Sequence, residues 1–466
     1  MIGAPAEDMD ILARLEECLD ARDIMRGGDI PQRNRKDWSD WMPAGRPLAV
    51  VTPRTTEQVA TILRQCNACA QPVVIQGGMT GLVGGASPQA NEIALSLERL
   101  RGIEDVDLVS RTMTVLAGTT LREAQQAAEA VDLYYGVDLG SRDTCTIGGN
   151  VATNAGGIQV LRYGMTRRNI VGIEVVLADG VVVSRLNKLS KDNTGYNWRE
   201  LLVGSEGTLG VITRVVLALQ PRPAAVQSAL CSVNSVENAY RLLAGLEAAF
   251  PAKVLTFEAM WREYLEVAGL VTKRQIFDGE IELAILCEAA LGEDEAARDQ
   301  FVLALSNLMD REVIADADIA QSSTERAQFW AWREAIYEFD RVLPKAEHFD
   351  VSLPFDRMDE GVQQLRILAA TAFPGSVLIV YGHLGDGNIH LAVSPRPLAS
   401  AADTLKTKVY EIICALGGSI SAEHGIGVLK RPYLHYGASP AEMSIMKSLK
   451  SALDPNAILG RGRILG

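Results

Sequence analysis

Three of the five histidines in this chain lie between residues 383 and 424, in the short segments 382–390 and 422–425. The first 347 residues contain no histidine. Imidazole titrates near neutral pH and is the commonest neutral metal ligand, so this uneven distribution favours a functional site over packing. We therefore expect the chemistry of the protein in its C-terminal third.

The order of these residues indicates a metal site. Residues 385–388, Gly-Asp-Gly-Asn, have the composition of a turn between two apolar runs, 377–381 and 389–393. His383 and His390 would then flank one connection between strands and approach the same ion. A carboxylate from Glu423 would complete a two-histidine, one-carboxylate set with open positions for a substrate. This set favours Zn²⁺, with Mn²⁺, Co²⁺ or Fe²⁺ as alternatives.

We assign His424 to proton transfer. It is adjacent to Glu423, and neighbouring side chains leave the backbone in different directions, so the two residues are expected to have different roles. Each histidine taken singly also fits a structural, hydrogen-bonded role, but the four residues together favour a functional site. A metal-dependent hydrolase without redox chemistry is an alternative for this set.

Three glycine-rich clusters in the N-terminal half indicate an extended cofactor. The first, residues 76–85, follows the apolar run 73–75, and the others span residues 138–157 and 204–213. Glycine lets backbone N–H groups approach a phosphate, and small residues let the chain pack against a planar ligand. The first cluster fits neither a Walker loop nor the Gly-x-Gly-x-x-Gly dinucleotide turn. Any one cluster is compatible with a tight turn, whereas three in one domain favour a cofactor.

These clusters resemble the flavin-binding segments of the vanillyl-alcohol oxidase, or para-cresol methylhydroxylase, type of FAD-binding domain. Segments 382–390 (Gly-His-Leu-Gly-Asp-Gly-Asn-Ile-His) and 422–425 (Ala-Glu-His-Gly) resemble FAD-dependent D-2-hydroxyacid dehydrogenases that oxidise D-lactate and D-2-hydroxyglutarate. The resemblance covers nearly the whole chain. It implies an α+β fold with a two-part FAD-binding domain (1–222), an antiparallel-sheet substrate-binding cap domain (223–410) and a helical C-terminal segment that returns to the FAD-binding domain (411–466).

The resemblance also implies which residues contact the cofactor. Residues 77–82 would hold the FAD pyrophosphate, residues 141–157 would line the flavin, and residues 206–212 would contact the adenosine end. Met79 stands in the glycine loop with no histidine nearby, so the FAD is expected to be non-covalent. The complete expected set is Gly77, Gly78, Met79, Thr80, Gly81, Leu82, Gly140, Ser141, Thr146, Gly148, Gly149, Asn150, Ala152, Asn154, Gly156, Gly157, Glu206, Gly207, Gly210 and Ile212.

The implied reaction is oxidation of a D-2-hydroxy acid to the 2-oxo acid. The acid would chelate the metal through its carboxylate and hydroxyl, His424 would take the hydroxyl proton, and a hydride would pass from C2 to flavin N5. Arg333 matches the family's substrate-carboxylate arginine, for which a salt bridge on a helix surface is the alternative role. A non-catalytic flavin-binding subunit would not require His424.

Three departures from the family bear on the substrate. Hydroxyglutarate-type relatives carry a threonine, a lysine and an asparagine where this chain has Tyr337, His348 and Ala392. The changes remove a fixed positive charge and an amide, which disfavours recognition of a second carboxylate. Near the C-terminus, residues 459–463, Leu-Gly-Arg-Gly-Arg, replace the usual Asn-Pro-Gly-Lys. We therefore expect a preference for D-lactate or a larger apolar analogue.

Composition agrees with a large globular protein. The chain has 466 residues, of which 48% are hydrophobic and 22% charged, and a formal charge of −13. An acidic surface disfavours nucleic acid and anionic membranes as partners. No apolar run reaches the roughly 18 residues that span a bilayer, so we expect a cytoplasmic protein, peripheral to a membrane at most. Expected partners are the hydroxy acid and an electron acceptor such as an electron-transfer flavoprotein, a quinone or a cytochrome; the chain could form a homodimer.

The pattern of apolar residues predicts several elements. We expect helices near residues 8–26, 57–70, 235–249, 294–308 and 401–416, a strand near residues 46–53, and a hairpin over residues 171–183 with an Asp-Gly turn. The Pro-Arg-Pro stretch at 221–223 predicts a domain boundary. Cys66 and Cys69 form a Cys-x-x-Cys that we assign to packing at the end of a helix, with redox or metal chemistry as the alternative.

Overall fold

The protein is described by a computed structural model that covers residues 10–465 except 41, 190, 278 and 280. The chain divides into two compact units. The first contains residues 1–157, 165–222 and 423–466, and the second contains residues 158–164 and 223–422. The chain thus passes from the first unit to the second after residue 222, and residues 411–422 are grouped with the second unit.

A small sheet holds the N-terminal part of the first unit. Its strand order is β1-β2-β4-β3, with β2, β4 and β3 parallel and β1 antiparallel to β2. Parallel neighbours require a crossover, and helix α2 provides one between β2 and β3. The elements are α1 (Ile11–Glu16), β1 (Ile24–Met25), β2 (Ala49–Val51), α2 (Thr56–Ala68), β3 (Val73–Gln76) and β4 (Ile93–Ser96).

An antiparallel sheet forms the second half of this unit, in the order β5-β6-β10-β8-β9. The strands are β5 (Ile103–Asp107), β6 (Thr112–Leu116), β8 (Ile170–Val176), β9 (Val182–Arg185) and β10 (Val211–Ala218). The remaining elements are α3 (Leu121–Glu129), β7 (Leu133–Tyr134), α4 (Ile147–Thr153), α6 (Arg199–Leu202), β11 (Gln220–Pro221), α13 (Leu434–Gly437) and α14 (Pro440–Leu453).

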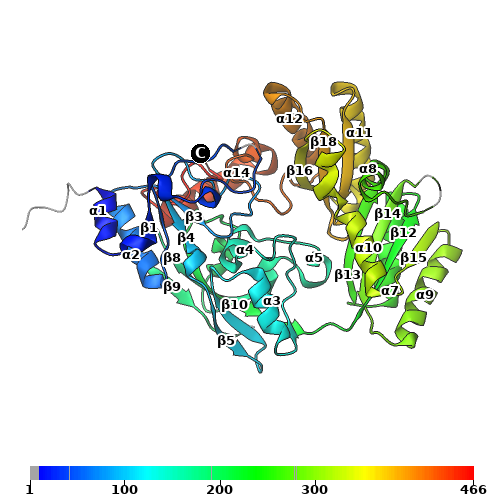
Figure 1. Cartoon of the computed structure of the whole chain (residues 1–466), viewed down its shortest axis with the longest axis horizontal. Coiled ribbons are helices and arrows are strands. Elements are labelled where there is room, and N and C mark those ends of the chain that lie inside the picture. The colour runs from blue at the N-terminus through cyan, green and yellow to red at the C-terminus, as the bar shows by residue number, and fades with distance from the viewer. Residues whose placement is uncertain (1–9, 41, 190, 278, 280, 466) are drawn as a thin grey trace, which may run out of the picture. The chain divides into compact units, whose positions relative to one another are not determined.

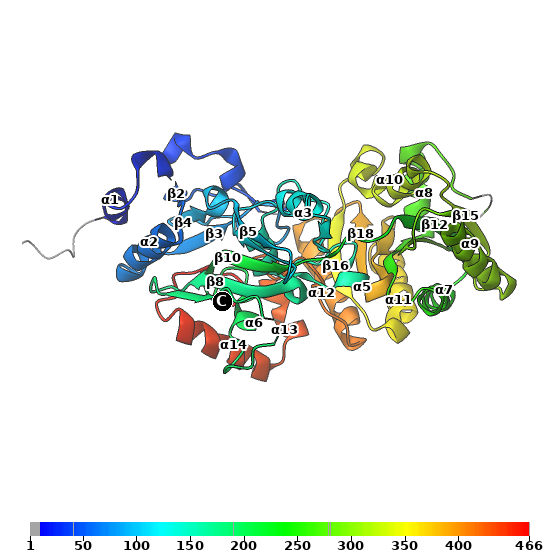
Figure 2. The same cartoon turned by 90° about the horizontal axis from the view of Figure 1, so that it is seen from below.

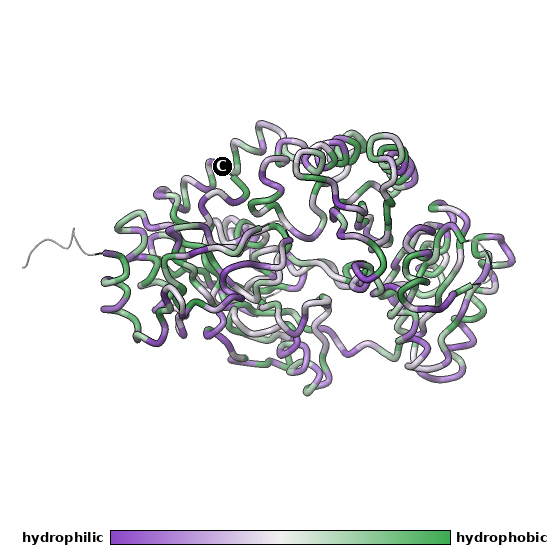
Figure 3. The backbone as a smooth tube through the Cα atoms, turned by 45° about the horizontal axis from the view of Figure 1, so that its top comes forward, coloured by the Kyte–Doolittle hydropathy of each residue, from purple (hydrophilic) through white to green (hydrophobic). Residues whose placement is uncertain are grey.

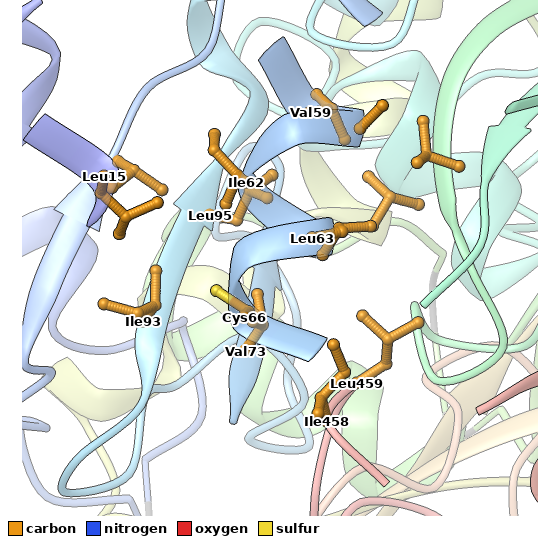
Figure 4. Packing of buried hydrophobic residues seen from close by; sticks show 14 of the residues in the cluster. Leu15, Val59, Ile62, Leu63, Cys66, Val73, Ile93, Leu95, Ile458 and Leu459 are labelled. Atoms are coloured by element: carbon orange, nitrogen blue, oxygen red, sulfur yellow. The ribbon is translucent and has the colours of Figure 1, made fainter. Parts of the chain in front are cut away.

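The C-terminal end of the chain completes the core under α2. Ile458 and Leu459 are fully buried together with Ile62, Leu63 and Cys66 of α2, and Figure 4 shows their side chains beside those of α2, β3 and β4. The backbone of residues 458–460 bonds to both the N–H and the carbonyl of Val73. Cys66 therefore packs in the core, as predicted, while Cys69 is exposed.

The second unit contains a seven-stranded antiparallel sheet in the order β15-β12-β14-β13-β17-β18-β16 (Figure 1). Its strands are β12 (Val226–Val233), β13 (Val254–Trp261), β14 (Leu283–Ala290), β15 (Asp316–Ile319), β16 (Glu347–Ser352), β17 (Val377–Gly382) and β18 (Asn388–Ser394). The predicted α+β architecture, with a two-part first domain and an antiparallel-sheet second domain, is confirmed.

Helices cover both faces of this sheet. Figure 2 shows α8 and α10 on one side and α7, α9, α11 and α12 on the other. The α8/α10 face buries an aromatic cluster that includes Tyr264, Trp332 and Tyr381. The helices are α5 (Val160–Tyr163), α7 (Val236–Ala249), α8 (Arg262–Thr272), α9 (Glu295–Asp310), α10 (Ser323–Arg333), α11 (Met358–Ala372) and α12 (Ala399–Ala415).

Most local predictions are confirmed, and one is wrong. Helices α2, α7, α9 and α12 and the hairpin β8–β9 lie where the pattern placed them, and the hairpin turns at Gly180 with φ +80°. Alternation of hydrophobic and hydrophilic stretches, the basis of these predictions, is visible along the chain in Figure 3. Residues 8 and 9 of the single helix predicted for residues 8–26 lie outside the described residues, and residues 10–26 contain the short α1, a 3₁₀ turn and strand β1 instead. The charged residues of this segment favour a helix, but the pairing of β1 with β2 stabilises an extended conformation instead.

Candidate active site

The first two glycine clusters pack against each other in the first unit. A Cβ on Gly78 would lie 2.2 Å from the carbonyl oxygen of Thr144, and one on Gly77 would lie 2.6 Å from Oγ1 of Thr146. The contact at Gly78 is with backbone and excludes a side chain there, whereas a side chain at Gly77 would displace the hydroxyl of Thr146. The glycines are therefore required by the close packing of two loops, which places both loops at one site.

The first cluster offers a run of unpaired backbone donors. No backbone N–H of residues 78–82 donates a hydrogen bond to another described residue, which is the arrangement that an anion-binding loop needs. Met79 in this loop adopts φ +59°, a conformation that non-glycine residues adopt mainly in turns and at functional sites. The second cluster adds Asn150, whose buried side-chain nitrogen has no hydrogen-bond partner. These orphaned donors fit a bound FAD.

Arg463 fixes the end of the first cluster, a role that sequence reasoning missed. Its guanidinium is 1% exposed and bonds to the carboxylate of Glu92 at 2.7 and 2.9 Å. It also donates to the carbonyl oxygens of Gly85 and Ser87. Arg463 therefore ties residues 459–463 to the exit of the glycine loop. An arginine within a glycine-rich segment was the available signal.

The segment that carries His424 is held from both sides within the first unit. The carboxylate of Glu423 accepts a 2.6 Å hydrogen bond from the backbone N–H of Gly157. The carboxylate of Glu206 accepts bonds of 2.8 Å from the N–H groups of Ile426 and Gly427. Burial raises the pKa of Glu206, although these hydrogen bonds oppose the shift. The side chain of Glu206, predicted to contact adenosine, thus bonds to the loop that contains His424.

His383 and His390 lie at one end of the β17–β18 hairpin in the second unit. Tyr381 and His390 are directly opposite in the ladder, and the loop between the strands begins at His383, as the turn composition predicted. The two imidazole rings are edge-to-face with centroids 5.2 Å apart. One nitrogen of each ring lies within 4.8 Å of a nitrogen of the other, which is close enough for one ion to bind both.

Glu258 of β13 fixes the orientation of His383. Its carboxylate is 1% exposed, and Oε1 lies 2.6 Å from Nδ1 of His383. Burial would raise the pKa of Glu258, but His383 and Arg333 together hold it below its ordinary value. An ionised carboxylate accepts only, so Nδ1 of His383 carries a proton and donates it to Glu258. A carboxylate that bonds to the ring is a common partner of a metal-bound histidine, so this contact fits a divalent metal at His383.

Arg333 is buried rather than part of a surface salt bridge. Its Nε donates to Oε2 of Glu258 at 2.8 Å, and its guanidinium lies over the ring of Tyr381 at 4.9 Å from the centroid. Tyr264 Oη donates toward the backbone carbonyl of Arg333 at 2.7 Å and so holds the end of helix α10. These contacts orient Arg333 beside the histidine pair within the second unit.

Asp350 completes this face of the sheet. It is fully buried, lies directly opposite His390 in the β16–β18 ladder, and places Oδ1 3.8 Å from Nδ1 of His390. Asn388 donates to the same carboxylate at 3.0 Å. Sequence reasoning missed both Glu258 and Asp350. The signal was a charged residue in the middle of an apolar strand, as in Leu-Thr-Phe-Glu-Ala-Met-Trp at 255–261.

The three residues predicted to shape the substrate site occupy different environments. His348 is exposed on β16 directly opposite Ala392 of β18, whose side chain is buried. Tyr337 is 77% exposed in the 3₁₀ segment Ala335–Arg341. The ladder thus brings two of the three positions together, and His348 shares the sheet face of Asp350 and His390.

Two family models match the chain. The model described as FAD binding domain matches residues 47–185, and the model described as FAD linked oxidases, C-terminal domain, matches residues 222–464. A D-2-hydroxyglutarate dehydrogenase of Xanthomonas citri pv. viticola is 36% identical over 437 residues, which cover 92% of this chain and 91% of that protein. This chain belongs to the family of FAD-dependent D-2-hydroxyacid dehydrogenases.

Members of this family differ in the substrate that their names state. A putative mitochondrial D-lactate dehydrogenase of Schizosaccharomyces pombe is 35% identical over 437 residues, covering 90% of this chain and 82% of that protein. The solved structure of p-cresol methylhydroxylase with substrate bound has a TM-score of 0.76 at 14% identity and covers 97% of this chain and 96% of that chain. The fold of the dehydrogenase is therefore the predicted flavoprotein fold.

Among the described residues of this family member, no helix combines the length and the apolar composition needed to cross a membrane.

Proposed function

We propose that this protein oxidises a D-2-hydroxy acid to the 2-oxo acid, with non-covalent FAD as the oxidant and a divalent metal, Zn²⁺ by preference, at the substrate. The observation that carries the proposal is the buried Arg333–Glu258–His383 arrangement beside His390, in a chain whose family is FAD-dependent. An arginine and a metal-binding histidine pair on one sheet face suit a substrate that has a carboxylate next to a hydroxyl.

The metal is proposed to be bound by His383, His390 and Glu423. The first two lie within one hairpin with their rings edge-to-face, and Glu258 bonds to Nδ1 of His383, as a carboxylate commonly does behind a metal-bound histidine. When bound, the metal would polarise the substrate hydroxyl and FAD would accept the hydride from C2.

The roles of the chain's own residues follow from their chemistry. Arg333 would bind the substrate carboxylate through the guanidinium nitrogens that it does not use for Glu258. His424 would take the hydroxyl proton as general base. Residues 78–82 would donate backbone hydrogen bonds to the FAD phosphates, and Asn150 would donate its amide N–H to the cofactor. Domain boundaries at 222 and near 411, an unidentified electron acceptor and a cytoplasmic location remain predictions.

Substrate preference is proposed to favour monocarboxylates such as D-lactate or a bulkier apolar analogue. His348 carries no fixed positive charge, unlike the lysine expected in hydroxyglutarate-type relatives, and Ala392 removes an amide donor. D-2-hydroxyglutarate, named for the Xanthomonas relative, is the alternative substrate.

A panel of D-2-hydroxy acids with an artificial acceptor dye tests this function. We expect anaerobic bleaching of the flavin by D-2-hydroxy acids and a kcat/KM for D-lactate or a bulkier monocarboxylate above that for D-2-hydroxyglutarate at pH 8. The variant His348→Lys should shift this ratio toward D-2-hydroxyglutarate. A wild-type preference for D-2-hydroxyglutarate that is unchanged by the lysine would overturn the substrate assignment, and a flavin that no D-2-hydroxy acid bleaches would overturn the reaction.

A further inference from the structure

Gln76 joins the two ends of the first glycine cluster through its side chain. It is the last residue of β3 and is fully buried, and Ala86 directly follows the cluster. The amide nitrogen of Gln76 donates to the backbone carbonyl oxygens of Ala86 at 3.1 Å and of Asn34 at 2.9 Å. Its amide oxygen accepts from Nδ2 of Asn34 at 2.9 Å. One buried amide thus holds together the entrance of the loop, its exit and the segment that contains Asn34.

The partners of this amide fix its orientation. Carbonyl oxygens can only accept, so the amide nitrogen of Gln76 must face Ala86 and the backbone of Asn34. The amide oxygen then faces the donor Nδ2 of Asn34. Both polar atoms of the buried side chain are satisfied in this orientation, whereas a flipped amide would leave carbonyl oxygens facing an oxygen, at a cost in free energy.

The loop between these two ends keeps its backbone donors for a ligand. No N–H of residues 78–82 donates to another described residue, and Met79 adopts φ +59°. The exit of the loop is held a second time by Arg463, which donates to the carbonyl oxygens of Gly85 and Ser87. A loop that is bonded at both ends and unbonded between them presents preorganised donors, which lowers the cost of binding an anion.

We propose that Gln76 is the positioning residue of the phosphate-binding loop: its amide keeps the two ends of the loop together, so that the N–H groups of residues 78–82 are placed for the FAD phosphates. The inference rests on the proposed function, because that function assigns these N–H groups to FAD. The contacts of Gln76 are with Asn34 and Ala86, so it acts on the cofactor through the loop.

Gln76→Met keeps the length of the side chain and removes its amide. The carbonyl oxygens of Asn34 and Ala86 then lose their donor, and the ends of the loop can separate. The matched control is Gln227→Met. Gln227 of β12 is 6% exposed, and its amide nitrogen donates to the carbonyl oxygen of Gly292 at 2.7 Å within the second unit. Both variants remove a buried amide from a strand, but Gln227 does not border the glycine loop.

Affinity for FAD and for riboflavin is the decisive measurement. The flavin-free full-length chain is titrated with each flavin, and quenching of flavin fluorescence gives the two dissociation constants. We expect Gln76→Met to bind FAD about 5- to 50-fold more weakly, the fold-change for one to two lost hydrogen bonds if bound FAD requires the joined ends. Its affinity for riboflavin, which has no phosphate, should match wild type. Gln227→Met should bind both flavins as wild type does.

The outcomes separate the inference from the proposed function. Wild type that binds no FAD, or that binds riboflavin as tightly as FAD, overturns the assignment of residues 78–82 to the FAD phosphates and the inference with it. Wild type that prefers FAD while Gln76→Met binds FAD equally well overturns the inference alone. So does an equal loss of affinity for both flavins in Gln76→Met, or an equal loss of FAD affinity in Gln227→Met, because a general loss of stability would then explain it.

A second variant does not depend on the folding of Gln76→Met. Asn34→Ala removes the bond from Nδ2 to Gln76 and leaves both carbonyl bonds of Gln76 in place. It should weaken FAD binding about two- to fivefold, the fold-change for one lost hydrogen bond, and leave riboflavin binding unchanged. The double variant should bind FAD no more weakly than Gln76→Met, because the side chain of Asn34 acts through Gln76. Wild-type FAD affinity in Asn34→Ala, or effects that multiply in the double variant, would overturn the inference.

Discussion

At the scale of single residues, paired contacts explain why each candidate functional side chain is where it is. Glu206 and Glu423 bond to backbone on either side of the His424 loop. Glu258 bonds to both His383 and Arg333. In each case a hydrogen-bonded carboxylate holds a neighbour in one orientation, which is how a folded chain limits the motion of reactive groups.

His424→Ala should lower the rate of flavin reduction by roughly 10²- to 10⁴-fold, the range for loss of a general base. FAD content should be unchanged, because no FAD contact is assigned to this side chain. The rate is measured by anaerobic stopped-flow absorbance with excess substrate.

The matched control is His435→Ala, which removes an exposed histidine in the same C-terminal segment. Its flavin reduction should be as fast as in wild type. A near-normal rate in His424→Ala would reassign His424 to a structural role.

At the scale of elements, the loops and the C-terminal segment depend on close approach and complete burial. The glycine loop after β3 packs directly on residues 144–146, and the backbone of residues 458–460 continues the packing beside β3. Residues 144–146 and 458–460 lie outside the helices and strands, yet their contacts fix the position of the glycine loop.

Gly78→Ala should strongly reduce the retention of FAD. Its Cβ would lie 2.2 Å from a backbone oxygen, so the loop must move; such overpacking costs about 1–3 kcal/mol, or roughly a five- to 150-fold loss of affinity if it falls on the bound state. The ratio of bound flavin to folded protein measures the effect.

Gly28→Ala provides the comparison, since no atom lies within 4 Å of the added Cβ. It should retain FAD as wild type does. Equal flavin occupancy in the two variants would show that the first glycine cluster does not bind the cofactor.

Leu459→Ala should destabilise the protein by about 2–5 kcal/mol, as expected for truncation of a fully buried leucine. The exposed Ile445 of α14 is the control, because Ile445→Ala should change stability by less than about 0.5 kcal/mol. Denaturant unfolding of the FAD-loaded protein compares the two. A Leu459→Ala effect no larger than that of Ile445→Ala would contradict the core assignment.

At the scale of the whole molecule, the proposed cofactors are assigned to different sets of residues. The residues expected to bind FAD all belong to the first unit, whereas His383, His390, Glu258 and Arg333 belong to the second. Loss of the metal should therefore leave the flavin site intact.

Removal of the metal with a chelator should abolish flavin reduction by substrate while leaving FAD bound, and added Zn²⁺ should restore the activity. Acid denaturation should release the FAD, because no histidine lies near the flavin loops. The flavin spectrum and metal analysis of the same sample measure both effects. Undiminished reduction in metal-free protein would refute the metal requirement, and flavin that stays with the precipitated chain would refute non-covalent binding.

Much of this protein could be predicted from local sequence. Glycine clusters, the histidine-containing turn, helix periodicity and the Asp-Gly hairpin are encoded by neighbouring residues, because backbone freedom and amphipathic spacing are local properties. The resemblance of these motifs to a known family predicted the family and the fold class, and the histidine-containing turn predicted the candidate ligands His383 and His390. The metal role itself, and the identity of the substrate, remain predictions.

Only the tertiary structure decided which distant residues hold those ligands. Glu258 and His383 are 125 residues apart, Glu206 and Ile426 are 220 apart, and Arg463 bonds to Glu92 across 371 residues. Strand order and register bring them together, and neither can be read from local periodicity. A buried charge needs a partner where its environment excludes water. The sequence does not show which of its many charged residues are buried, so only the tertiary structure identifies these pairs.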